Sequence, residues 1–283
     1  MTIDEAFIYC ENVSKRHYEN FPVGLLVPQN IQKYVFSIYA FARFADDIAD
    51  EGDAELEDRE RQLENWLCQL DECYSGKSKH PIFIALGKTI QEFNIPKSLF
   101  ADLIKAFIMD IKKNRYENFD EILYYCKHSA NPIGRLMLIL FNKSNNETVL
   151  YSDYICSALQ IANFLQDVSV DIKKNRIYFP LDRFAKNNYS EQDFFDKKIN
   201  DSFITIFDEQ LNETYKFFEQ GKPLVKHLKG KIKFEILLTI EAGKTILKKT
   251  NLIKHNIFFQ RPTITTIDKL ILLVKAAVQW ILT

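Results

Sequence analysis

Two pairs of aspartates, each interrupting an apolar stretch, constrain what this chain can fold into. Asp46 and Asp50 form the first pair, and Asp167 and Asp171 form the second. Residues four apart lie on one face of an α-helix, one turn from each other. Charged side chains are seldom left beside a core without partners. A single pair arises readily by chance and is typical of a solvated helix face, but two pairs in apolar surroundings indicate a shared function.

The residues before the second pair extend it with further oxygen ligands. Asn163 lies one helical turn before Asp167, and Gln160 lies about a turn before Asn163. Because every candidate ligand is an oxygen, a hard divalent cation is the partner that fits both pairs. The sequence therefore predicts Mg²⁺ and a substrate that carries phosphates.

Basic side chains lie close to both pairs. Arg43 precedes Asp46 by three residues and shares nearly the same helix face. It could contact a phosphate oxygen bidentately or form an ion pair with Asp47 or Asp50, and spacing alone leaves both open. A basic group also follows the second pair, where cations suit the helix macrodipole: Lys173, Lys174 and Arg176. Capping is the favoured role for the two lysines.

The composition predicts an all-α protein. The chain has 283 residues, of which 47% are hydrophobic and only 8 are Gly and 8 Pro, so turn-forming residues are sparse. Periodic apolar segments without repeats or interdomain linkers indicate one domain over residues 1–283. Helices are predicted over 29–52, 57–73, 82–93, 96–113, 119–141, 147–173, 200–221, 231–253 and 264–282. Pro132 should kink the fifth of these, either for packing alone or to widen a cavity.

Several classes of protein are disfavoured. A formal charge of -1 gives no electrostatic reason to expect nucleic acid as a partner. The five cysteines form no Cys-x2-Cys pair, which is typical of reduced thiols in an intracellular protein. Asp4 and Glu5 argue against a secretory signal. The apolar run in 263–282 is too short and too closely bracketed by charges to span a bilayer, so we expect a buried or interfacial helix there.

Three groups of residues, taken together, carry a resemblance to a known family. They are Arg43-x2-Asp46-Asp47-x2-Asp50-Glu51, then Tyr125-Cys126-x3-Ala130-x3-Gly134, and Gln160-x2-Asn163-x3-Asp167-x3-Asp171 followed by Arg176-Ile177-Tyr178-Phe179-Pro180. Their order and spacing resemble the squalene/phytoene synthase family from His17 to about Pro262. The resemblance implies a single-domain class I isoprenoid synthase: an α-helical bundle around a central cavity, in which Mg²⁺ ions bind and ionise a diphosphate.

The resemblance also implies roles for individual residues. The implied metal ligands are Asp46, Asp50, Asn163, Asp167 and Asp171. The implied substrate-binding residues are Arg43, Asp47, Gln160, Asn163 and Arg176. Tyr125 joins the four motif aspartates as a catalytic candidate, since it could place a water molecule.

A narrower resemblance is to the bacterial hydroxysqualene synthase branch. It rests on phrases such as His17-Tyr18-Glu19-Asn20-Phe21-Pro22-Val23 and the closing Gln260-Arg261-Pro262. Condensing members usually carry Ser and a basic residue before the aromatic at Phe21, and a basic residue where this chain has Gln166. Fewer cations fit an enzyme that handles one diphosphate instead of two.

This narrower resemblance implies a reaction and its setting. Presqualene diphosphate would be ionised, rearranged and captured by water as hydroxysqualene in the cytoplasm, with peripheral contact to the inner face of the membrane. The enzyme that makes presqualene diphosphate would be a partner. The alternatives are head-to-head condensation of two prenyl diphosphates and a non-catalytic assembly role, which the retained aspartates disfavour. Asp167 and Asp171 also disfavour a terpene cyclase, which typically has Asn-x3-Ser/Thr-x3-Glu in the second motif.

Overall fold

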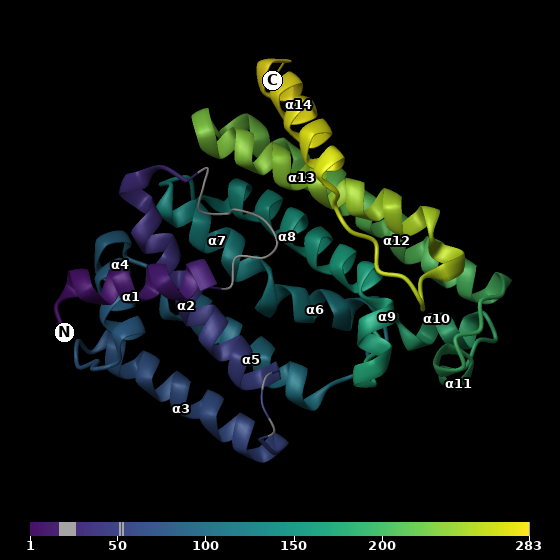
Figure 1. Cartoon of the computed structure of the whole chain (residues 1–283), viewed down its shortest axis with the longest axis horizontal. Helices are drawn as coiled ribbons and strands as arrows, with labels where there is room; N and C mark the ends of the chain where they lie inside the picture. Colours follow the sequence, from purple (N-terminus) through teal and green to yellow (C-terminus); the bar gives the residue numbers. More distant parts are fainter. Residues whose placement is uncertain (17–26, 51, 53, 283) are drawn as a thin grey trace. The chain divides into compact units, whose positions relative to one another are not determined.

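The protein is built from helices (Figure 1). The computed structural model describes residues 1–16, 27–50, 52 and 54–282, and over these residues it contains no strand, only an isolated bridge between Tyr116 and Pro180. The predicted all-α class is confirmed. The chain divides into two compact units, Met1–Lys112 with Pro132–Asn145 and Lys113–Asn131 with Asn146–Thr283. The expectations of one domain over 1–283 and of a central cavity stay predictions.

The first unit is organised around one long helix, α2 (Gln29–Asp50). Its other helices are α1 (Ile3–Arg16), α3 (Leu56–Tyr74), α4 (Pro81–Phe93), α5 (Lys97–Lys112) and most of α7 (Asn131–Leu140). Helix α2 packs against α1, α3, α4 and α5. The ring of Phe41 on α2 is fully buried, with its centroid 5.9 Å from Trp66, 5.8 Å from Phe83 and 5.2 Å from Phe100. These aromatic contacts hold the helix that carries the first aspartate pair.

The second unit is organised around α8 (Asn146–Gln166). Its other elements are α6 (Phe119–Ser129), α9 (Val168–Asp171), η1 (Ile172–Lys174), α10 (Leu181–Lys186), α11 (Glu191–Phe195), α12 (Asp201–Gly221), η2 (Lys222–His227), α13 (Gly230–Leu252), η3 (Lys254–Asn256) and α14 (Thr266–Leu282). Helix α8 packs against α6, α12 and α13. Two glycines permit this close packing. A Cβ at Gly221 would lie 2.8 Å from the carbonyl oxygen of Tyr151, and one at Gly243 would lie 2.4 Å from the ring of Phe218.

Two of the predicted helices are each divided in two. The helix predicted over 119–141 is α6 followed by α7, with Ala130 between them at φ −99° and ψ −42°. Pro132 lacks a backbone N–H and so cannot continue the bonding of α6, which explains a break where a kink was predicted. The helix predicted over 147–173 ends at Gln166, because Asp167 leaves helical geometry at φ −100° and ψ 12°. Helices α1, α10 and α11 were not predicted.

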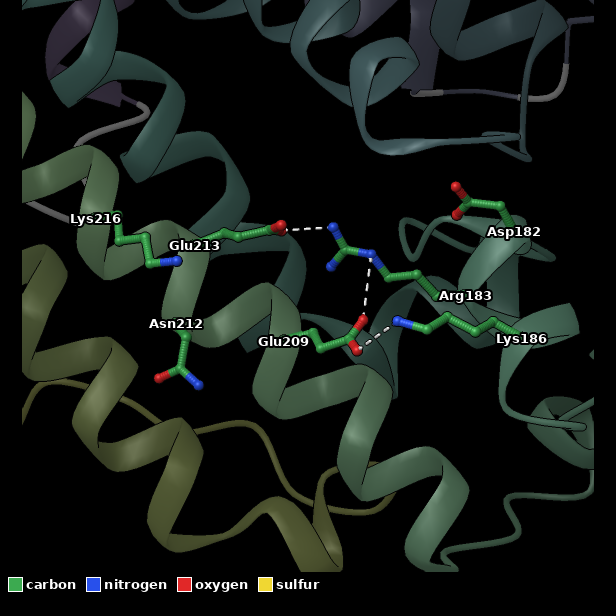
Figure 2. Close-up of a pocket in the computed structure, with 7 residues that line it drawn as sticks. All are labelled: Asp182, Arg183, Lys186, Glu209, Asn212, Glu213 and Lys216. Carbon is green, nitrogen blue, oxygen red and sulfur yellow. Dashed lines mark hydrogen bonds and ion pairs between the residues drawn. The ribbon is translucent and has the colours of Figure 1, made fainter.

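Ion pairs attach the short helix α10 to α12 (Figure 2). The guanidinium of Arg183, a buried residue, lies 2.6 Å from Glu213 and 3.7 Å from Glu209, and Lys186 lies 3.4 Å from Glu209. The same guanidinium stacks 5.1 Å from the ring centroid of Phe119. Helix α10 has few apolar residues that could hold it by packing. The ion pairs and the ring contact therefore hold the segment that follows the second aspartate pair.

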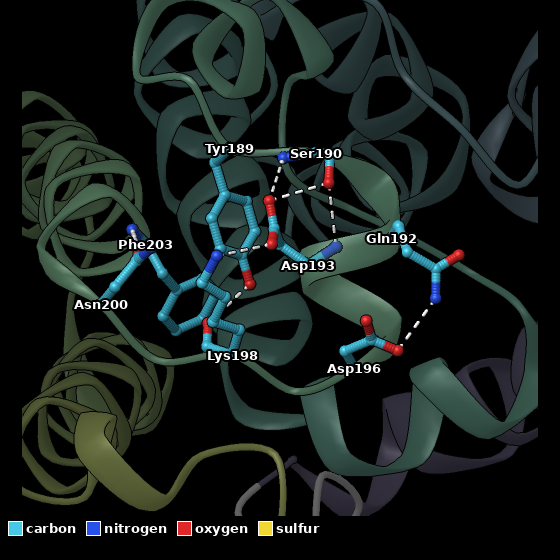
Figure 3. A network of polar contacts seen from close by, with 8 residues as sticks. All are labelled: Tyr189, Ser190, Gln192, Asp193, Asp196, Lys198, Asn200 and Phe203. Atoms are coloured by element: carbon cyan, nitrogen blue, oxygen red, sulfur yellow. Dashed lines mark hydrogen bonds and ion pairs between the residues drawn. The ribbon is translucent and has the colours of Figure 1, made fainter.

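Local polar contacts define the start of α11 and the turn after it (Figure 3). Ser190 and Asp193 form a capping box: the side chain of Ser190 accepts from the Asp193 N–H at 3.0 Å, and the side chain of Asp193 accepts from the Ser190 N–H at 2.9 Å. Lys198 lies 2.9 Å from Asp193, and the Tyr189 hydroxyl donates to the Lys198 carbonyl at 2.8 Å. These bonds let a helix of only 5 residues persist.

Candidate active site

The first aspartate pair lies on the last two turns of α2. Arg43 forms ion pairs along its own helix, 3.3 Å from Asp46 and 2.6 Å from Asp47. Asp50, the last residue of α2, is exposed. The predicted alternative of an ion pair between Arg43 and Asp47 is therefore present, and Asp46 shares the same guanidinium. Contact between Arg43 and a phosphate stays a prediction. Glu51, Tyr18, Glu19 and Asn20 lie outside the described residues.

A buried arginine holds the backbone directly after the first pair. Arg59 donates hydrogen bonds to the carbonyls of Ile48 at 3.0 Å, Ala49 at 2.7 Å and Gly52 at 2.6 Å. A further bond reaches the Ala54 carbonyl at 2.9 Å. The carbonyls at a helix C-terminus carry partial negative charge, and acids in the last turn add to it, so a guanidinium there compensates both. Sequence reasoning missed this residue.

The second aspartate pair keeps helical register across a break in the helix. Asn163 lies on the last turn of α8, Asp167 lies at the break and Asp171 ends α9. The Asp167 N–H donates to the Asn163 carbonyl at 2.8 Å, and the Asp171 N–H donates to the Asp167 carbonyl at 2.8 Å. These two bonds keep the helical backbone register across the break, as the predicted stripe of three oxygen-bearing side chains requires.

An arginine from the far end of the chain pairs with the second motif. Both Nε and a terminal nitrogen of Arg261 contact the Asp167 carboxylate, the latter at 3.3 Å. The hydrogen bond to Asp167 is the main cause that raises the pKa of Arg261. Next to it, the buried side-chain amide of Gln166 donates to the Pro262 carbonyl at 2.6 Å. Sequence reasoning did not assign Arg261 to the site, although Gln260-Arg261-Pro262 was among the matching phrases.

Aromatic side chains lie directly behind the second motif. Phe164, adjacent to Asn163, stacks on Tyr178 with centroids 3.8 Å apart. Tyr125 is buried against both rings, 5.6 Å from Phe164 and 6.3 Å from Tyr178. The structure thus brings the Tyr125 segment into contact with the segment Arg176-Ile177-Tyr178-Phe179-Pro180, which spacing alone did not predict. These rings offer π faces that favour a nearby positive charge.

The remaining predicted residues lie in the same unit. Gln160 is a partly exposed residue of α8, and the Arg176 N–H donates to the Asp171 carbonyl at 3.0 Å. Asn175, which precedes Arg176, adopts the left-handed conformation at φ 56°. Arg115 holds this turn, with bonds of 2.5 Å to the Asn175 carbonyl and 2.8 Å to its side chain. Roles for Gln160 and Arg176 in substrate binding stay predictions.

The oxygen ligands of the two motifs suit a hard cation, and each unit carries one of the two aspartate pairs. The motif carboxylates are at least partly solvent-accessible, and their only ligand atoms are oxygens. Within either unit, the described residues contain no group of three or more His, Cys, Asp or Glu side chains that could enclose a metal ion. The predicted ligands Asp46 and Asp50 belong to the first unit, and the other three belong to the second. A shared metal site therefore stays a prediction.

A separate polar hollow in the second unit does not fit the predicted chemistry. It has a volume of about 500 Å³ and lies between α10 and α12 (Figure 2). Its lining consists of Asp182, Arg183, Lys186, Glu209, Asn212, Glu213 and Lys216. The charges of the three cations and three carboxylates in this lining cancel. The side chains of Arg183 and Lys186 already form ion pairs with these carboxylates. Such a site has no excess positive charge for a diphosphate.

Comparison with known proteins agrees with the motifs. Residues 14–268 match the family described as Squalene/phytoene synthase. Phytoene synthase 2, chloroplastic, of Solanum lycopersicum is 26% identical over 278 residues, covering 96% of this chain and 89% of that protein. The crystal structure of squalene synthase HpnC from Alicyclobacillus acidocaldarius is similar with a TM-score of 0.84 and 29% identity, covering 90% of this chain and 95% of that one. A dehydrosqualene synthase crystal structure shares the fold with a TM-score of 0.86 at 18% identity, covering 99% and 98%.

Proposed function

Because the chain belongs to the squalene/phytoene synthase family, whose enzymes act on prenyl diphosphates, we propose that it ionises presqualene diphosphate and releases hydroxysqualene. The observation that carries this proposal is the pair of aspartate motifs, each retained whole and each next to a guanidinium. In this proposal Asp46, Asp50, Asn163, Asp167 and Asp171 would hold Mg²⁺, which when bound would supply positive charge to offset that of the leaving diphosphate. The protein's own side chains perform the remaining work.

The arginines hold the carboxylates in place before the substrate arrives. Arg43 orients Asp46 and Asp47 on α2, and Arg261 orients Asp167. On binding of the diphosphate, each guanidinium would be shared between its carboxylate and a phosphate oxygen, with Arg176 and Gln160 as further contacts. Preformed positive charge lowers the barrier to breaking the carbon–oxygen bond because it requires no reorganisation during the step.

The aromatic cluster supplies the environment for the cation that remains. The stacked rings of Phe164 and Tyr178, with Tyr125 against them, present π faces directly behind the second motif. The cyclopropylcarbinyl cation would rearrange there and be captured by water, which loses a proton to give the alcohol. Tyr125 is the proposed residue for placing this water. No step of this sequence requires a reductant.

The state of Gln166 supports handling of a single diphosphate. This position, where condensing enzymes have a basic residue, holds a neutral amide whose donor is used by the Pro262 carbonyl. It therefore contributes structure and no positive charge. The departures at Tyr18, Glu19 and Asn20 support handling of a single diphosphate from sequence alone.

Head-to-head condensation of two prenyl diphosphates is the second candidate. Phytoene synthases of Solanum lycopersicum and of Arthrospira platensis match 96% of the chain at 26% and 25% identity, which favours this chemistry. It would use the same aspartates, but its first ionisation would be that of one of the two prenyl diphosphates. It differs in needing a second diphosphate site, and hence more positive charge than the proposed reaction.

Product analysis by mass spectrometry separates the two candidates. Presqualene diphosphate, farnesyl diphosphate and geranylgeranyl diphosphate are offered in separate reactions with Mg²⁺ and without NADPH. Hydroxysqualene from the first and no product from the others is the expected result. Consumption of farnesyl or geranylgeranyl diphosphate would instead establish a condensing enzyme. If hydroxysqualene is formed, a separate enzyme must supply presqualene diphosphate in the cytoplasm, and it is the proposed partner.

A further inference from the structure

The C-terminal helix α14 exposes a continuous apolar face. Of its large apolar side chains only Leu272 is buried, together with the small Ala276. The exposed fraction is 61% for Leu270, 64% for Val274 and 76% for Ile281. Other exposed apolar residues of this helix are Ile267, Ile271, Leu273, Val278, Trp280 and Leu282. At 100° per residue, the face opposite Leu272 and Ala276 contains no charged residue.

Three polar side chains of α14 contact α13 instead. Asp268 pairs with Lys249 of α13 and accepts from the Thr265 N–H at 2.7 Å, which caps the helix. Gln279 donates to Glu241 of α13 at 3.0 Å, and Lys275 lies 3.9 Å from the same carboxylate. Helices of globular proteins normally turn the apolar stripe inward and the polar face to solvent. Here the polarity is reversed, so the apolar face needs another environment.

The charges around this face fit an anionic lipid surface. Lys269 and Lys275 lie on opposite edges of the apolar face, about 60° to either side of Leu272, and both are exposed. Of the nearby acids, Asp268 pairs with Lys249, and Glu241 lies 3.9 Å from Lys275, which would be shared between this acid and the lipid. Lysines that flank an apolar face can extend to lipid phosphates while their stems stay in the apolar layer.

The dimensions of α14 fit a helix that lies on a bilayer. Its 17 residues give a length of about 25 Å. Among the described residues no helix is long and apolar enough to cross a membrane. Trp280, near the end of the helix, is an aromatic residue of the kind enriched at the boundary between headgroups and acyl chains. In Figure 1, α14 lies along α13 with its C-terminal end projecting beyond their contact.

We propose that α14 docks the protein on an anionic bilayer, with its apolar face in the boundary between headgroups and acyl chains. The inference deepens the proposed function, because a polyprenyl substrate and its product both partition into lipid. Docking by α14 would keep the enzyme at the surface where both are found. Its test requires no turnover, so failure of the docking proposal and failure of the proposed reaction are distinguishable.

Vesicle co-sedimentation tests the docking face. Phosphatidylcholine vesicles with and without phosphatidylglycerol are mixed with the parent protein, with Leu270→Glu/Val274→Glu, and with the control Ile3→Glu/Ile8→Glu on α1, whose residues are also exposed. Binding to the anionic vesicles should fall by about tenfold or more in the α14 variant and be unchanged in the control. Lys269→Ala and Lys275→Ala should each weaken it by about fivefold. Equal binding by the α14 variant and the parent would overturn the proposal.

Intrinsic fluorescence gives an independent readout, because the chain has only 2 tryptophans. Trp66 is 2% exposed in the core of the first unit, whereas Trp280 is 44% exposed on α14. Anionic vesicles should shift the emission to shorter wavelength, and Trp280→Phe should abolish that shift while sedimentation persists. Light scattering addresses a second copy as the occupant. If the parent binds no vesicles and forms a dimer that Leu270→Glu/Val274→Glu dissociates, the face is a protein interface and the proposal is wrong.

Discussion

The two aspartate motifs solve the same physical problem with different parts of the chain. The first lies in an unbroken helix, and its cation, Arg43, comes from the same helix one turn away. The second lies where α8 ends and α9 begins, and its cation, Arg261, comes from 94 positions further along the chain. An arginine also bonds backbone carbonyls near the end of each motif: Arg59 near the first and Arg115 near the second.

The difference shows what each motif requires for its geometry. The first needs only helix formation, because residues at i, i+3 and i+4 meet on any helix. The second needs the chain to return from α13, and Gln166 holds the returning segment through Pro262. Carboxylates that receive a metal must be held in position with little reorganisation, and an intrahelical pair achieves this locally. The second motif depends instead on the packing of its whole unit.

The largest effect should follow from removing one carboxylate of either motif. We expect Asp46→Ala and Asp167→Ala each to lower turnover at saturating Mg²⁺ by about a thousandfold, because each removes a proposed metal ligand. Far-UV circular dichroism should remain that of the parent, since both side chains are at least partly exposed. Product formation from presqualene diphosphate measures the loss. Activity near the parent level in either variant would remove that motif from the site.

The arginines behind the motifs should separate the two regions by stability. Arg59→Met leaves the carbonyls of Ile48, Ala49 and Gly52 without their donor at a buried position, so we expect unfolding to become easier by about 4 kcal/mol. Arg115→Met, its counterpart, should cost about 1 kcal/mol because its bonds are solvent-exposed.

Urea denaturation measures the loss of stability in both methionine variants, and amide hydrogen exchange shows which segment of the chain is loosened. Exchange should accelerate at the end of α2 in Arg59→Met and around Asn175 in Arg115→Met. Arg59→Lys is the matched control, since one ammonium can retain part of the bonding. If the two methionine variants lose equal stability, burial does not distinguish the two turns.

The fold was predictable to the extent that local pattern determines it. Helix α2 was predicted over 29–52 and spans Gln29–Asp50, since its apolar periodicity is strong and it contains no breaker. The break after Ser129 follows from Pro132, although only a kink was expected there. Helix α11 escaped prediction because its existence depends on a capping box and the salt bridge to Lys198, within a segment too short to show periodicity.

The candidate site was predictable in its residue types and less so in its contacts. The Arg43–Asp47 pair was one of two alternatives drawn from spacing, and the structure contains it. Nothing in the spacing joins Arg261 to Asp167, because that contact depends on how α13 packs and where its following segment returns. Arg59 was equally invisible, since its partners are backbone carbonyls that carry no side-chain signature.

A variant that changes how stability depends on pH tests whether the two units unfold together. Burial without a hydrogen-bond partner for its Oε2 raises the pKa of Glu235 on α13 to about 7. The folded state therefore holds a proton that the unfolded state has lost, and stability falls as pH rises from about 4.5 to 7. Glu235→Gln should remove this penalty, stabilising the fold by about 3 kcal/mol at pH 8 and by about 1 kcal/mol at pH 5.

In a Trp280→Phe background, fluorescence from Trp66 reports on the first unit alone. If the predicted single domain is correct, Glu235→Gln should shift the Trp66 transition in urea at pH 8 as far as it shifts the circular dichroism. A Trp66 transition that does not move would show that the unit carrying the first motif unfolds independently. Each motif would then depend on the free energy of unfolding of its own unit.

The smallest expected effect tests the non-local contact itself. Gln166→Ala frees the Pro262 carbonyl and loosens the segment that presents Arg261, while Arg261→Ala removes the guanidinium from Asp167. Because both act on one contact, their effects on stability should not add, and a double-mutant cycle should give a coupling of about 1 kcal/mol. Arg43→Ala with Gln166→Ala is the control and should be additive within about 0.5 kcal/mol. Additivity in both cycles would mean that Gln166 does not position Arg261, and the second motif would then be as locally determined as the first.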